Sequence, residues 1–265
     1  MAQLAIGNQQ WTDRIRRAGE LLRLQPHAEE LLTLYLALLE PQQQAYERAG
    51  QERPAARELP AYVATIVLPG ILAATLRAGP KKLRGAAMTR FHEADLPELI
   101  ARWLGGSELS ATDRYLARAS TAPVLEALPE IGREIGGSAG TDPRHCPSCG
   151  GEPQLSYFGI SGEALVAAPR CLLCFRCGES WVYPRMVCAG CGSEDTAKLP
   201  IFADTARFAN VRADACEVCR RYLLTIDLPK DPTAVPVVDE LAALPLDLYV
   251  RERGFTKITP NLMGF

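Results

Sequence analysis

Eight cysteines occur in two copies of one spacing pattern. The first copy is Cys146-x2-Cys149 with Cys174-x2-Cys177, and the second is Cys188-x2-Cys191 with Cys216-x2-Cys219. In each copy 24 residues separate the two pairs, and each cysteine of the second copy lies 42 positions after its counterpart. A CxxC turn holds two sulfurs close together, and two such turns complete a tetrahedron of thiolates around a metal ion. The repeat therefore predicts two consecutive four-thiolate metal sites of the zinc-ribbon or rubredoxin-like type.

The residues beside the cysteines agree with this interpretation. Gly150, Gly178 and Gly192 each follow the second cysteine of a pair. Glycine at this position lets the backbone take a positive φ as it turns around the metal. The 24 residues between the pairs can form a short hairpin that returns the chain.

Two other uses of the cysteines fit less well. A disulfide framework is typical of small secreted chains, whereas this sequence has nine cysteines, an odd number, and shows no secretory signal. A thioredoxin-type redox site needs one CxxC motif in a βαβ setting, not four motifs at ribbon spacing.

Cys171 is the ninth cysteine, and it extends one motif to CxxCxxC. The first site could therefore use Cys171 and Cys174 in place of Cys174 and Cys177, although the 42-residue register favours the latter pair. Cys171 is then a spare thiol. It is either a small apolar residue on a strand or a redox or sulfur-handling thiol beside a metal site, and the sequence leaves both open.

The elements around these motifs divide the chain into an α+β arrangement. Residues 1–140 are predicted to form a helical domain, because apolar residues recur there at spacings of three and four. The glycine-rich run 136–140 predicts a linker. Within residues 141–230, short β-like runs that alternate with the CxxC turns predict strands at 154–158, 164–168, 180–183, 206–212 and 222–226. Residues 141–186 are predicted to form the first four-cysteine module. Residues 187–265 are predicted to form the second, followed by a helix over 237–253 that Pro245 kinks and Gly254 ends.

Two segments of the helical half differ from the rest in charge. Residues 59–76 carry no charge, but Pro69 and Gly70 would interrupt a helix there, so we expect two buried helical pieces of a soluble core and no membrane insertion. Residues 79–85 form a basic stretch, which we expect to be a solvated connecting loop or a docking patch for an acidic partner.

Composition restricts the classes of function. The 265-residue chain has a net charge of −2, and the segment between Cys146 and Cys219 contains eight acidic and six basic residues. Because metal-bound thiolates add further negative charge, a nucleic-acid-binding role is disfavoured. No nucleophile elbow, phosphate-binding loop or dinucleotide fingerprint is present. Closed four-sulfur sites also leave no position for a substrate, so we expect a protein that is not an enzyme.

Longer runs resemble a known family. The run from Arg212 to Asp227 and the run 234–247 are similar to the FdhE family, the formate dehydrogenase accessory proteins, as are Gly254-Phe255 and Asn261-Leu262. The first module matches through Cys146-Pro147-x-Cys149-Gly150 and through the run 170–177. The resemblance covers most of the chain and is closer in the C-terminal half. The family tends to carry an aromatic residue where this chain has Cys171.

The resemblance implies a helical domain joined to two rubredoxin-like modules that hold iron, with zinc as the alternative occupant. It implies a cytoplasmic accessory protein that binds the catalytic subunit of formate dehydrogenase during its maturation. The alternatives are a rubredoxin-like electron-transfer protein and, less favoured, a zinc-ribbon nucleic-acid-binding protein. Candidate contact surfaces are a helical face, the basic stretch near Lys81 and Lys82, and the family's acidic pair Asp239-Glu240, which is expected to stay charged.

Overall fold

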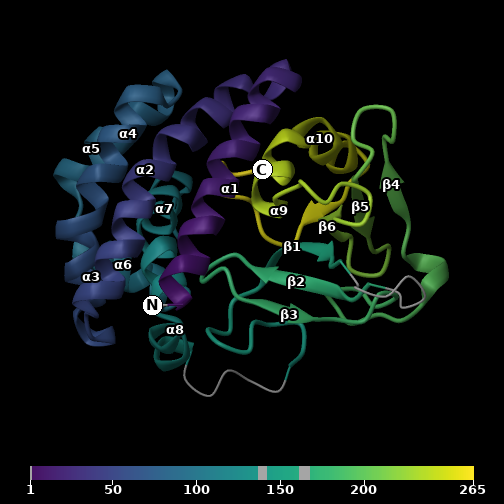
Figure 1. The fold of residues 1–265 in the computed structure, drawn as a ribbon. Helices are drawn as coiled ribbons and strands as arrows, with labels where there is room; N and C mark the ends of the chain where they lie inside the picture. The colour runs from purple at the N-terminus through teal and green to yellow at the C-terminus, as the bar shows by residue number, and fades with distance from the viewer. Residues whose placement is uncertain (1, 137–141, 161–167) are drawn as a thin grey trace. The chain divides into compact units, whose positions relative to one another are not determined.

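The structure is a computed structural model that describes residues 2–136, 142–160 and 168–265, with side chains from residue 9 onward (Figure 1). The chain forms two compact units, one of residues 1–138 with 262–264 and one of residues 139–261 with Phe265. The predicted linker at 136–140 and the domain boundary after residue 140 fall on 137–141, which lie outside the described residues.

Helices build the first unit. Its α-helices are α1 (Ala2–Leu24), α2 (Glu29–Glu52), α3 (Leu59–Tyr62), α4 (Leu68–Ala78), α5 (Lys81–Glu93), α6 (Leu96–Leu104), α7 (Ala111–Ala127) and α8 (Pro129–Gly136). Helix α2 packs against α1, α4 and α7 (Figure 1). Leu38, Ile71 and Leu116 are completely buried in this bundle, so its core comes from the apolar stripes of separate helices.

The uncharged segment is one helical run, not two pieces. A π turn, Val63–Val67, joins α3 to α4. Pro69 cannot donate a backbone hydrogen bond within this run, and the widened turn just before it accommodates that loss, with Leu68 N–H bonded to the Val63 carbonyl. The run 56–78 is long and apolar enough to be a candidate membrane span by composition, and half of its most apolar window is buried within the protein.

The basic stretch was expected to be a loop, and that expectation is wrong for most of its length. Pro80 is the N-cap of α5, which begins at Lys81. The lysines therefore occupy the first turn of a helix. Proline just before a helix is compatible with this start because its missing N–H is not needed there.

A seven-stranded sheet organises the described part of the second unit. Its strands are β1 (Pro153–Phe158), β2 (Arg170–Cys174), β3 (Ser180–Val182), β4 (Ile201–Ala203), β5 (Val211–Ala215), β6 (Arg221–Asp227) and β7 (Thr256–Lys257). The strand order is β3-β2-β1-β6-β5-β4, with β7 paired to β6 (Figure 1). Each module contributes an antiparallel three-stranded meander, and β1 and β6 join the two meanders in parallel. The two modules consequently share one sheet.

Two C-terminal helices cover this sheet. Helix α9 (Pro236–Ala242) packs on β1 and β6, and α10 (Leu244–Glu252) packs on β4 and β5 (Figure 1). The predicted single kinked helix is therefore two helices, because Ala243 leaves the helical conformation two residues before Pro245, which lies in the first turn of α10. Leu224, Ile226 and Val250 are fully buried between sheet and helices.

Candidate metal centres

The four CxxC knuckles share one backbone hydrogen-bond pattern. In the first knuckle the Cys146 N–H donates to the Gly151 carbonyl at 2.9 Å, and the Cys146 carbonyl accepts from the Gly150 N–H at 2.9 Å. The knuckles that begin at Cys174, Cys188 and Cys216 repeat both bonds with the residues five and four positions further on. The repeated spacing in the sequence thus corresponds to a repeated local structure.

Positive φ angles close every knuckle. Gly150, Gly178 and Gly192 have φ of 70°, 70° and 76°, which confirms the role predicted for these glycines. In the fourth knuckle the equivalent residue is Arg220, with φ of 58°. A non-glycine residue in this conformation is strained, and the sequence analysis did not identify it.

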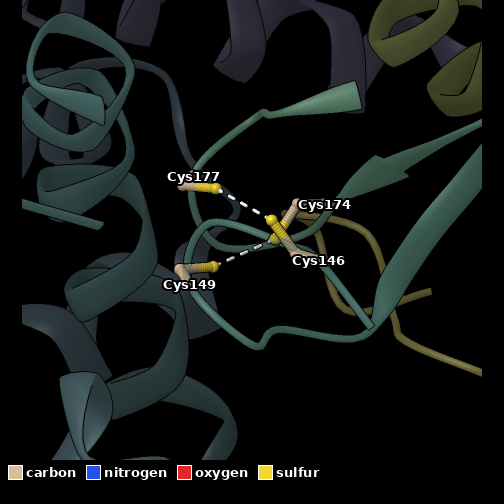
Figure 2. A group of neighbouring side chains, drawn as sticks. All are labelled: Cys146, Cys149, Cys174 and Cys177. Carbon is tan, nitrogen blue, oxygen red and sulfur yellow. Dashed lines mark hydrogen bonds between the residues drawn. The ribbon is translucent and has the colours of Figure 1, made fainter. Parts of the chain in front are cut away.

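The first four sulfurs converge on one point. Figure 2 shows the side chains of Cys146, Cys149, Cys174 and Cys177 directed toward one another. Sγ of Cys146 lies 3.6 Å from Sγ of Cys177, and Sγ of Cys149 lies 3.4 Å from Sγ of Cys174. All four sulfurs lie within 4.8 Å of one another, and all four residues are buried.

The second set repeats this geometry nearer the surface. Sγ of Cys188 lies 3.7 Å from Sγ of Cys219, and Sγ of Cys191 lies 3.8 Å from Sγ of Cys216. These four sulfurs also lie within 4.8 Å of one another, but Cys191 and Cys219 are only half-buried. The two clusters therefore differ mainly in their access to solvent.

The sulfur separations fit a tetrahedral metal ion. Metal–sulfur bonds of about 2.3 Å give a regular tetrahedron with sulfur–sulfur edges of about 3.8 Å. The four sulfur–sulfur contacts above run from 3.4 to 3.8 Å, and the other separations in each cluster stay within 4.8 Å. All nine cysteines of the chain are free thiols, so none is used in a disulfide. Four soft thiolates suit zinc or iron. Each cluster can accordingly hold one such ion.

Electrostatics inside the first cluster also call for a cation. Hydrogen bonds with Cys149, and then with Cys174 and Cys177, lower the pKa of Cys146. The pKa of Cys177 is raised, first by its hydrogen bond with Cys146 and then by those with the other two thiols. The pKa of Cys149 is also lowered, whereas that of Cys174 is raised. Ionisation of all four thiols is therefore unfavourable without a cation, and a bound metal ion would stabilise the four thiolates together.

Cys171 belongs to neither cluster. It lies on β2, where it pairs with Tyr157 on one side and Val182 on the other. Because side chains alternate along a strand, Cys171 is on the opposite face of the sheet from Cys174. The structure therefore brings together the four cysteines that the 42-residue register selects, and the alternative pair Cys171 and Cys174 cannot share an ion.

Sequence reasoning missed one glycine that allows close approach to the sulfurs. A Cβ atom on Gly151 would lie 2.9 Å from Sγ of Cys174 and 3.3 Å from Sγ of Cys149. Within the second cluster, the Gly190 N–H donates to Sγ of Cys188 at 3.3 Å. Only the position of Gly151 just after a CxxC motif could have indicated its role.

The acidic pair is not a contact surface. Asp239 is 4% exposed and Glu240 is fully buried. Asp239 accepts a hydrogen bond from the Val235 N–H at 2.8 Å, at the start of α9. Glu240 forms an ion pair of 2.7 Å with the buried Lys257, which also bonds Asp247 at 2.8 Å. Residues 239–240 were expected as a candidate contact surface, and that expectation is wrong, because both carboxylates bond to groups inside the second unit.

Comparison with known proteins places the chain. Residues 186–263 match the family described as FdhE, C-terminal domain. A protein named FdhE homolog from Aquifex aeolicus is 35% identical over 121 residues, which is 46% of this chain and 42% of the relative. Another from Pseudomonas aeruginosa is 31% identical over 190 residues, or 68% of this chain and 60% of the relative. The chain thus spans less than two thirds of the length of these relatives.

A solved structure agrees with the whole fold. The crystal structure of the FdhE protein from Pseudomonas aeruginosa superposes with a TM-score of 0.70 at 22% identity, covering 96% of this chain and 94% of that one. The superposition therefore includes the helical unit as well as the four-cysteine clusters. Residues 186–263 therefore match the FdhE C-terminal domain, and the chain shares the fold of an FdhE protein.

Proposed function

We propose that this chain is a non-enzymatic accessory protein for the maturation of formate dehydrogenase and that it binds the catalytic subunit of that enzyme in the cytoplasm. The observation that carries the proposal is the pair of closed four-cysteine clusters in a chain that matches the FdhE C-terminal domain and shares the fold of an FdhE protein. Four sulfurs saturate a tetrahedral ion and leave no position for a substrate or an activated water. This supports a binding or electron-transferring role over hydrolysis.

The eight clustered cysteines are the proposed ligands, four in module 141–186 and four in module 187–265. Iron in a rubredoxin-type site is the proposed occupant of each, and zinc is the alternative because soft thiolates accept either ion. Visible absorption of the purified protein tests this assignment, since ferric thiolate sites are coloured and zinc sites are not. A colourless protein that contains two zinc ions per chain when isolated from its native source would contradict the iron assignment.

Co-purification tests the partner. We expect the tagged chain to retain a formate dehydrogenase catalytic subunit under reducing, oxygen-free conditions, and Cys149→Ser and Cys191→Ser variants to retain much less. Cys171→Ser is the matched control, because it also replaces a thiol of the second unit but lies outside both clusters. A wild-type chain that retains no catalytic subunit, or a Cys171→Ser variant that fails like the cluster variants, would count against the proposal.

A rubredoxin-like electron carrier is the second candidate function. The half-buried Cys191 and Cys219 favour it, because electron exchange needs an ion near the surface. Zinc has no redox chemistry, so a zinc-loaded chain separates the two functions. If zinc-loaded protein matures formate dehydrogenase as well as iron-loaded protein does, electron transfer is not the essential activity.

A further inference from the structure

A small pocket with an arginine-rich lining lies beside the second cluster. Its open volume is about 50 Å³, and its lining includes Cys188 and residues from both modules. This volume holds roughly three or four water molecules, or one carboxylate group with its neighbouring methylene. Four arginines line it against a single acidic residue, Asp214; they are Arg170, Arg185, Arg212 and Arg221.

Guanidinium groups outnumber carboxylates around this pocket. Asp214 serves two of them, lying 3.6 Å from Arg170 and 2.9 Å from Arg212. Arg221 pairs with Glu152 at 2.9 Å. Among the described residues, Arg185 bonds to the backbone carbonyl of Ala168 and pairs with no carboxylate. These guanidinium groups form a cationic floor beside the Cys188 thiolate, which also lines the pocket.

Arg185 keeps an unused donor, whereas Arg212 is held by Asp214. Nε of Arg212 lies 2.9 Å from one carboxylate oxygen of Asp214, and its Nη2 donates to the other at 3.5 Å. Nε and Nη2 of Arg185 both donate to the Ala168 carbonyl, and among the described residues its Nη1 makes no hydrogen bond. The Arg185 and Arg212 guanidinium groups both stack on the Phe158 ring, at 4.5 Å and 4.9 Å, which fixes their positions.

The rim of the pocket is apolar. Met186 and Ile201 belong to the lining and are 56% and 54% exposed. Large apolar side chains with this much exposure beside a cationic floor match a ligand with an anionic tip and an apolar body. A free inorganic anion would use the floor but not the rim.

We propose that this pocket binds an aspartate or glutamate side chain of a partner polypeptide, with apolar residues of that polypeptide packed on Met186 and Ile201. Guanidinium groups recognise carboxylates through paired, charge-assisted hydrogen bonds. The proposal goes beyond the proposed function and does not require the partner to be formate dehydrogenase. It identifies the chemistry of one contact, whichever protein supplies it.

Calorimetric titration of the metal-loaded full chain tests the proposal. The probes are acetyl-Leu-Asp-Leu-amide, the same peptide with Asn in place of Asp, and inorganic phosphate. We expect the Asp peptide to bind about tenfold or more tightly than the Asn peptide, since hydrogen bonds between charged groups contribute that much. We also expect its affinity to fall as salt is added.

Matched arginine variants locate the binding site. Arg185→Gln and Arg212→Gln should each weaken binding of the Asp peptide by about tenfold or more. Arg207→Gln removes the same charge from an exposed turn outside the pocket and should change the affinity by less than about twofold. Metal content and far-ultraviolet circular dichroism of each variant show whether it remains folded and loaded.

Three results would overturn the proposal. Equal affinity for the Asp and Asn peptides would show that the pocket does not recognise the carboxylate group. Phosphate binding as tight as that of the Asp peptide would identify a free-anion site instead. If both pocket variants fail to bind the peptide and also lose their metal, these arginines only balance the charge of the second cluster. Peptide binding by a chain that retains no formate dehydrogenase subunit would leave this proposal standing and reject the proposed function.

Discussion

Arg220 combines backbone strain with contacts that hold the C-terminal segment. Its φ of 58° is equivalent to the glycine angles of the other three knuckles. Its guanidinium group stacks 4.0 Å from the Phe255 ring centroid and donates to the Arg253 carbonyl at 2.8 Å, and its own carbonyl accepts from the Thr256 N–H. The side chain therefore offsets a conformational cost that glycine would avoid.

This balance predicts an order of stability at position 220. Arg220→Ala loses the side-chain contacts and keeps the strain, so it should be less stable than Arg220→Gly by about 1 kcal/mol. Denaturant unfolding of the metal-loaded proteins measures the difference. Gly150→Ala is the matched control, because a Cβ there meets nothing within 4 Å while φ is 70°, so its cost reports the φ angle alone. An alanine variant as stable as the glycine variant at position 220 would contradict the account.

The sequence predicts the cysteine ligand sets but not this arginine. Identical spacing predicts identical knuckles, and the three glycines predict the positive φ angles of their knuckles. At the fourth knuckle the chain uses a tertiary contact with Phe255, 35 positions away, to stabilise the same conformation. Local sequence carries no record of such a contact, and so only the structure reveals it.

At the scale of elements, one lysine organises the helices that cover the sheet. Lys257 on β7 contacts Glu240 of α9 and Asp247 of α10, and the Tyr222 hydroxyl on β6 donates to Asp247 at 2.8 Å. Burial by itself lowers the pKa of Lys257, but Glu240 and Asp247 raise it by more. Burial raises the pKa of Glu240, against the lowering effect of Lys257. Three elements consequently depend on one cation.

Replacing this lysine should destabilise the second unit in a pH-dependent manner. Lys257→Met leaves two buried carboxylates without a cation, and the expected loss is about 3–5 kcal/mol at pH 7. A carboxyl group whose folded pKa is raised stabilises the fold below its unfolded pKa and loses that contribution as pH rises through the folded value. The deficit should therefore be larger at pH 8.5 than at pH 6, measured by denaturant unfolding.

A second substitution separates charge from packing at this site. Adding Glu240→Gln to Lys257→Met removes one uncompensated charge and should recover part of the lost stability, as a double-mutant cycle detects. A deficit that is independent of pH and unchanged by Glu240→Gln would contradict the role assigned to the charge of Lys257.

The elements themselves were predicted unevenly. The strand runs at 154–158, 180–183 and 222–226 correspond to β1, β3 and β6, since each is a short run with aromatic or β-branched residues next to a knuckle. The run expected at 206–212 begins too early, because residues 204–210 form turns and β5 starts at Val211. The run expected at 164–168 lies mostly outside the described residues. The pairing of β1 with β6 was not predictable, because a parallel pair between distant strands leaves no local pattern.

At the scale of the whole molecule, the two units obtain their stability from different sources. The first unit has a conventional apolar core that includes Trp11, Leu32 and Ile100. In the second unit the larger core beneath β5 and β6 comes from the second module, with Tyr157 packed against it. The smaller cluster of Leu172, Tyr183 and Leu223 is shared by both modules, and it lies on or beside strands that enter or leave the cysteine knuckles. Metal ions should therefore stabilise the second unit far more than the first.

Metal removal should consequently unfold one unit and spare the other. Zinc binding contributes about 10–16 kcal/mol in zinc-finger peptides, whereas whole domains are stable by about 5–15 kcal/mol. After treatment with a strong chelator and a thiol reductant, we expect limited proteolysis to degrade residues 142–261 while a helical fragment of about residues 1–136 survives. Circular dichroism should retain most of its helical signal, and readdition of the metal before proteolysis should restore protection. Degradation of both units, or protection of both, would mean that the clusters do not control the folding of the second unit.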